Sequence, residues 1–138
     1  MKLATTIGDF EYYTNTPAEA VQQFAGTGFR YFDYNFYNVI FPGSAFLQAH
    51  WMDEIIAAQR AARKLGYTFV QAHSPNYNPL DPAADHEAGM LATLRAIEAC
   101  GYLGIPNIVV HSGCTQEYRY QYFHLNYHNI QKNSDEFL

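Results

Sequence analysis

Apolar and polar residues follow two alternating patterns along this chain. Apolar runs of strand length occur at 2–7 (KLATTI), 29–35 (FRYFDYN), 67–73 (YTFVQAH) and 105–111 (IPNIVVH). Between these runs, apolar residues recur every three or four positions, which is typical of amphipathic helices. Four predicted strands that alternate with three predicted helices indicate an α/β fold with right-handed crossovers and a parallel sheet, in which the strands lie side by side in chain order.

Local signals predict where the helices begin, end and pack. Thr16 is the expected N-cap of the first helix, with Pro17 in its first turn and Glu19 closing a capping box. The second helix is expected to end at Gly66. Its apolar stripe, predicted to be buried, contains Leu47, Trp51, Ile55, Ala58, Ala62 and Leu65. The third helix is expected to bury Met90, Leu94, Ile97 and Leu103.

A repeat links the later units of the chain. Three of the predicted strands follow a glycine that is expected to end the preceding helix, and these glycines, Gly28, Gly66 and Gly104, are separated by 38 residues in both intervals. The repeating unit is therefore one helix plus one strand.

Polar side chains occupy the same place in each repeat. The seventh residue after each glycine is Asn35, His73 or His111, at the end of its predicted strand. In parallel α/β proteins the functional site lies beyond the carboxyl ends of the strands. A single strand-end histidine is more often a structural residue. Two histidines in phase favour a shared pocket, with Asn35 on its rim.

Composition narrows the classes of function. The chain has 138 residues and a net charge of −5, so it suits one domain and offers no basic surface for nucleic acid. Cys100 and Cys114 lack the spacing of a metal or redox motif. No run has the length of a signal peptide or a membrane span. We expect a cytoplasmic protein that acts on small molecules, with no nucleic acid or membrane partner.

The segments FDYNF, VQAHSPN and NIVVHSGC, separated by helices of this length, resemble the first half of the xylose-isomerase-like TIM barrels. This superfamily contains sugar phosphate isomerases and epimerases and the endonuclease IV type of DNA repair enzyme. The resemblance covers residues 1–114 and implies the N-terminal half of a TIM-barrel domain, with about four strands and three helices. Residues 115–138 would be a tail in which a fourth helix begins and is truncated.

The resemblance implies metal-assisted proton transfer on a sugar or polyol. Family members that act on sugars hold Mn, Mg, Co or Zn through carboxylates and a histidine from later strands, and a cation can stabilise the enediolate formed. His73 and His111 match positions on the substrate side of that pocket, and Asn35, expected to bind substrate with them, could hydrogen-bond its hydroxyl groups. In the endonuclease-like alternative, His73 and His111 would themselves be zinc ligands. Asp33 could bind hydroxyl groups or face the helical layer instead.

The sequence departs from the family beyond its fourth unit. A complete barrel needs about 250 residues, and the metal-binding carboxylates of the later strands have no counterparts in this chain. A truncated gene product, a frameshift and a deliberately cut chain all fit this pattern. We therefore expect an incomplete site that is inactive alone. The alternative is a non-catalytic half-barrel that self-associates, or pairs with a separate C-terminal half, through its uncovered sheet edges.

Overall fold

A computed structural model of the protein describes residues 3–113 and shows a four-stranded parallel sheet. The strand order is β1-β2-β3-β4, which confirms the predicted parallel arrangement. The strands are β1 (Ala4–Thr6), β2 (Tyr31–Asn35), β3 (Thr68–His73) and β4 (Ile108–Val109). The fold is therefore α/β, while closure into a barrel stays a prediction. The expected tail at 115–138 lies outside the described residues.

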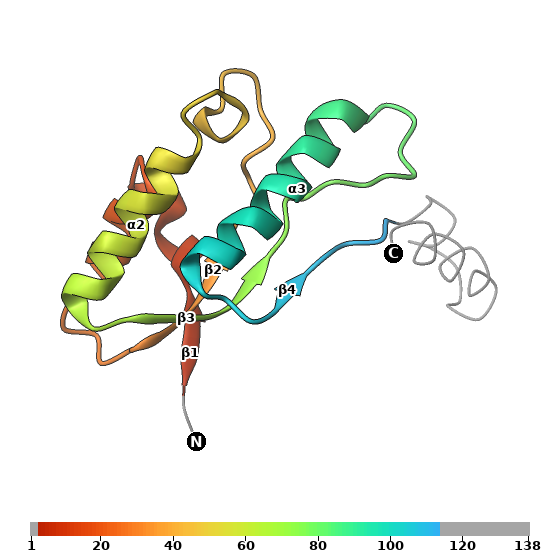
Figure 1. Cartoon of the computed structure of the whole chain (residues 1–138). Coiled ribbons are helices and arrows are strands. Elements are labelled where there is room, and N and C mark those ends of the chain that lie inside the picture. Colours follow the sequence, from red (N-terminus) through yellow and green to blue (C-terminus); the bar gives the residue numbers. More distant parts are fainter. Residues whose placement is uncertain (1–2, 114–138) are drawn as a thin grey trace, which may run out of the picture.

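The helices lie on one side of this sheet (Figure 1). The α-helices are α1 (Pro17–Gln23), α2 (Met52–Leu65) and α3 (His86–Leu103), and two short 3-10 helices are η1 (Ile7–Tyr13) and η2 (Ala45–Leu47). Helix α2 packs between α1 and α3. Within residues 3–113, no helix is both long enough and apolar enough to cross a lipid bilayer.

Capping contacts explain most of the helix bounds. The Thr16 hydroxyl accepts a hydrogen bond from the Glu19 amide at 3.2 Å. The Glu19 carboxylate in turn accepts one from the amide of Asn15, one residue before the cap. Gly66 and Gly104 end α2 and α3 with φ values of 68° and 72°, a left-handed conformation that glycine adopts without a steric penalty.

The core lies between the sheet and the helices. Along β2, Phe32 and Tyr34 are buried beneath the helices, and Phe36 continues this row just after the strand. Asp33 and Asn35 alternate with them and therefore face the opposite side of the sheet. Each fully buried large apolar side chain contributes about 1.5–3 kcal/mol to folding. This alternation places the polar strand-end residues on the face that the helices leave open.

The buried face of α3 differs from the prediction. Met90, Leu94 and Ile97 are 42%, 57% and 47% exposed. The residues that α3 buries are small: Gly89, Ala92, Thr93, Ala96, Ala99 and Cys100. They form their own stripe at helical spacing, and small side chains let a helix approach its neighbours closely. The expectation was wrong for these three residues because it followed hydrophobicity and overlooked the periodicity of the small residues, whereas Leu103 is partly buried against the core.

Trp51 is less buried than predicted. Helix α2 begins at Met52, so Trp51 is its N-cap and lies at the end of the apolar stripe. Its ring is only partly buried, packing edge-on against Phe46 with 5.4 Å between ring centroids. The Arg95 guanidinium lies 5.3 Å from the Trp51 ring centroid. The indole therefore covers a junction between η2 and α3.

Candidate functional site

The open face of the sheet carries a row of polar side chains. In the register between β2 and β3, Asn35 pairs with His73 and Asp33 pairs with Gln71. The register shifts at Val70, which has no partner on β2. At the start of the strands, Tyr31, three residues after Gly28, pairs with Thr68, two residues after Gly66. The extra residue at the bulge removes this offset, so the seventh residues after the two glycines lie opposite each other. Asn35 and His73 are therefore immediate neighbours at the carboxyl edge.

The His73 and Asp33 side chains lie within ion-pair distance of each other on this face. The Nδ1 atom of His73 lies 3.0 Å from each carboxylate oxygen of Asp33. The Gln71 amide donates a longer hydrogen bond of 3.4 Å to the same carboxylate. Because an ionised carboxylate only accepts hydrogen bonds, the His73 proton belongs on Nδ1, which leaves Nε2 as an acceptor in the neutral ring. Asp33 therefore faces the open side of the sheet, and the alternative that it lies in the helical layer is excluded.

His111 lies beside His73. The two imidazoles are stacked, with 6.4 Å between ring centroids and 27° between ring planes. Strand pairing places His73 level with Val109, so His111 stands two residues further along. Because β4 ends at Val109, His111 lies two residues beyond the strand and not at its end as predicted, and its ring still packs beside His73. His111 is exposed. Its imidazole and the Tyr37 ring meet in a T-shaped arrangement, with 6.4 Å between ring centroids.

Asn35 is fixed by contacts within the fold. Its amide nitrogen donates to the Glu11 carboxylate at 3.1 Å, and its side-chain oxygen accepts from the Tyr37 amide at 3.0 Å. The Asn38 amide donates to the other Glu11 oxygen at 2.5 Å. These contacts hold Asn35 at the carboxyl edge of β2. Its predicted role in substrate binding stays a prediction, as does that of His73 and His111.

Sequence reasoning did not single out Glu11. It lies in η1, which follows β1 directly, so it occupies the carboxyl edge of the first strand. The same strand-end argument that identified Asn35, His73 and His111 applies there. The signal was missed because the first unit precedes the glycine repeat and has no residue in phase with it.

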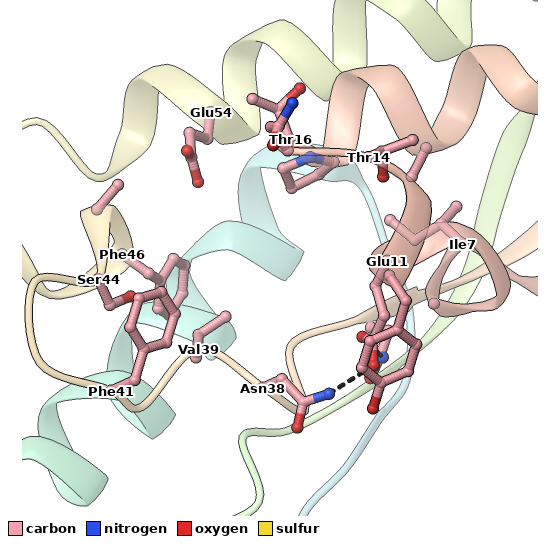
Figure 2. A pocket seen from close by; sticks show the side chains of 17 residues that line it. Ile7, Glu11, Thr14, Thr16, Asn38, Val39, Phe41, Ser44, Phe46 and Glu54 are labelled. Atoms are coloured by element: carbon pink, nitrogen blue, oxygen red, sulfur yellow. Dashed lines mark hydrogen bonds between the residues drawn. The ribbon is translucent and has the colours of Figure 1, made fainter.

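A pocket of about 630 Å³ opens beside this edge. Figure 2 shows it between η1, the start of α1, the segment that contains η2, and the first turn of α2. Glu11 and Asn35 belong to its wall, as do Ser44, Phe46 and Glu54. Burial raises the pKa of the Glu54 carboxyl above its usual range because removal from water disfavours the charged form.

The described residues do not form a metal site on their own. Among residues 3–113, no group of three or more His, Cys, Asp or Glu side chains is placed to hold a metal ion. Both Asp33 oxygens are turned toward His73 Nδ1, so that carboxylate and the two imidazoles do not converge as ligands. Ligation of zinc by His73 and His111, implied by the endonuclease-like alternative, stays a prediction.

Comparison of the chain with protein-family models, curated proteins and solved structures finds no match. The parallel α/β fold is therefore established by the strand order and the interleaved helices alone. Membership of the xylose-isomerase-like superfamily remains an inference from the strand-end motifs.

Proposed function

We propose that the open face of the sheet binds a sugar or polyol, in a protein of the sugar isomerase and epimerase type whose complete family performs metal-dependent proton transfer. The observation that supports this proposal is the stacked pair of His73 and His111, with Asp33 holding the Nδ1 side of His73. Two imidazoles at one carboxyl edge offer hydrogen bonds to neighbouring hydroxyl groups of a single ligand.

The polar groups of this face suit hydroxyl ligands. Gln71 offers an amide and His73 keeps Nε2 as an acceptor, while the Asn35 amide and the Asp33 carboxylate are engaged by Glu11 and His73 and fix the rim of the site. The His73 and Asp33 side chains are 38% and 15% exposed, so the imidazole is accessible and the carboxylate is more enclosed. This arrangement orients a ring nitrogen toward a bound hydroxyl group and holds its tautomer fixed, as a carboxylate partner does for histidines in many enzymes.

The described residues bind and orient rather than complete the reaction. Proton transfer next to a carbonyl needs a base near the substrate carbon and stabilisation of the developing enediolate. In the family, those groups lie on later strands than the four described here. We therefore expect the described residues to bind a sugar and to depend on other groups for its turnover.

A binding titration tests the proposal. The side-chain nitrogen signals of His73 and His111 would be followed by NMR while D-fructose, an unphosphorylated ketose, is added. We expect saturable shifts of both histidines and weaker binding in His73→Ala and His111→Ala. His50→Ala is the matched control, because His50 is exposed and lies outside the strand-end set. Unchanged histidine signals at saturating sugar would refute the proposal.

The second candidate function, a self-associating half-barrel, is favoured by the sheet edges. Among the described strands, β1 and β4 are at opposite edges of an all-parallel sheet. Beside the edge at β4, Val109 and Val110 are 37% and 39% exposed. A second copy could pair its β1 with β4, and its β4 with β1, so that two copies continue the parallel order into eight strands. Sedimentation equilibrium would show a dimer under this proposal, whereas a monomer at all concentrations would exclude it.

A further inference from the structure

The pocket beside η2 contains a carboxylate without a countercharge. Glu54 lies in the first turn of α2 and is partly buried. Within residues 3–113 its carboxylate has no hydrogen bond and no ion pair. Figure 2 shows this carboxylate pointing into the pocket. A charge that is removed from water and left unpaired costs stability, so a ligand that supplies the missing partner would be bound favourably.

A second polar group in the same wall is also unpartnered. Ser44 is only 2% exposed and lines the pocket. Its side chain makes no capping bond to η2, and no described residue partners its hydroxyl. A hydroxyl that has no partner among the described residues and borders a cavity is placed to bond a ligand. Ser44 and Glu54 thus supply two acceptors from different segments of the chain.

The remaining lining determines the charge of the ligand. Among the described lining residues there is no Lys, Arg or His, while Glu11 adds a second carboxylate that Asn35 and Asn38 hold in place. This charge pattern repels anionic ligands, including phosphorylated ones. Phe46 and Phe41 add aromatic surface, which attracts cations through the negative faces of the rings.

We propose that this pocket binds a small organic cation, in which a primary ammonium group contacts Glu54 and Ser44 and an apolar body lies against Phe46. This pocket borders the open face of the sheet at Asn35 but is not lined by His73 or His111, and the proposal does not depend on the function proposed there. A neutral polyol would hydrogen-bond the same groups but would leave the Glu54 charge without a counterion. The ammonium group supplies both donors and charge, and hydrogen bonds between ions are about twice as strong as neutral ones.

The test is a titration with n-butylammonium chloride, followed by NMR through the backbone amides of Ala45 and Thr16, which line the pocket. n-Butanol and n-butyrate are the neutral and anionic probes of similar size. We expect saturable binding of butylammonium and weaker or absent binding of the other two. Glu54→Gln should weaken butylammonium binding by about tenfold or more, and Ser44→Ala should also weaken it.

Asp53→Asn is the matched control. Asp53 precedes Glu54 in the same first turn of α2, is exposed, and does not line the pocket. The Asp53→Asn substitution removes the same charge from the same helix end as Glu54→Gln does. The affinity for butylammonium should nevertheless stay within about twofold of the unmodified protein, because exposed charges interact weakly with distant groups. The proposal is overturned if butylammonium binds no more tightly than butanol, or if Glu54→Gln and Ser44→Ala both leave its affinity unchanged.

Discussion

His73 Nδ1 lies 3.0 Å from both carboxylate oxygens of Asp33, across the boundary between two adjacent parallel strands. Asp33 comes from the middle of β2 and His73 from the end of β3. The contact is possible because the bulge at Val70 aligns the two strand ends. It fixes one side of the imidazole and leaves the other toward the open face, which is the basis of the function that we propose.

The Asp33 contact should determine the tautomer of His73. Near neutral pH we expect the neutral fraction of His73 to carry its proton on Nδ1, because the carboxylate accepts from that atom. In Asp33→Ala this preference should be lost, while His111 keeps its own tautomer balance. Nitrogen chemical shifts of labelled histidine side chains measure both. A His73 proton found on Nε2 in the unmodified protein would show that the contact does not persist in solution.

The Tyr34 hydroxyl should cost stability rather than add to it. Tyr34 is buried, its hydroxyl has no hydrogen-bond partner among the described residues, and burial raises its pKa far above the usual range. Tyr34→Phe removes the unpaired group and should stabilise the fold by about 1 kcal/mol. Tyr67→Phe is the control, because the Tyr67 hydroxyl donates to the Phe24 carbonyl at 2.9 Å and its loss should cost about 1 kcal/mol. Equal effects of the two substitutions in urea denaturation would contradict this account.

Glu54 should make stability fall as the pH rises. Its pKa in the folded protein is raised above the ordinary value of 4.5, so between the two values the folded state holds more protons than the unfolded state. The penalty is absent at low pH and appears as the pH climbs through and above 4.5. Glu54→Gln should therefore be more stable than Asp53→Asn near neutral pH, with the difference vanishing in acid. Urea melts across pH measure it, and a pH-independent difference would refute the assignment.

The two faces of the helical layer should respond differently to truncation. Leu94 is 57% exposed and Ile55 only 1% exposed. Leu94→Ala should change the unfolding free energy by less than about 0.5 kcal/mol, whereas Ile55→Ala should cost about 2–5 kcal/mol. A large loss in Leu94→Ala would mean that another part of the chain, or a second copy, covers this stripe of α3.

Much of the fold could be predicted because the glycine repeat and the strand patterns both indicate parallel strands in chain order, separated by helices. Gly66 and Gly104 end helices as expected, whereas the first helix ends at Gln23, five residues before Gly28. The polar residues that follow Gly66 and Gly104 reach one edge of the sheet. The packing of α3 could not be read from hydrophobicity, since alanines such as Ala92 and Ala96 fill its interface. A pattern of large side chains does not reveal how closely a helix approaches a sheet.

The pocket was beyond sequence reasoning for a different reason. Glu11 and Glu54 lie 43 residues apart in sequence, and their common cavity depends on where η1 and the segment before α2 place their backbones. Charged residues near helix starts are ordinarily explained by the helix dipole. Only the observation that Glu54 is partly buried without a partner separates it from Asp53 beside it.

The central claim is that His73 and His111 act together on one ligand, and a double-mutant cycle tests it most directly. The affinity for D-fructose would be measured in the unmodified protein, in His73→Ala, in His111→Ala and in the double variant. We predict that the two losses are coupled by about 0.5–3 kcal/mol, as expected for residues in contact that share a ligand. Losses that add independently, or an affinity that neither substitution changes, would contradict the claim.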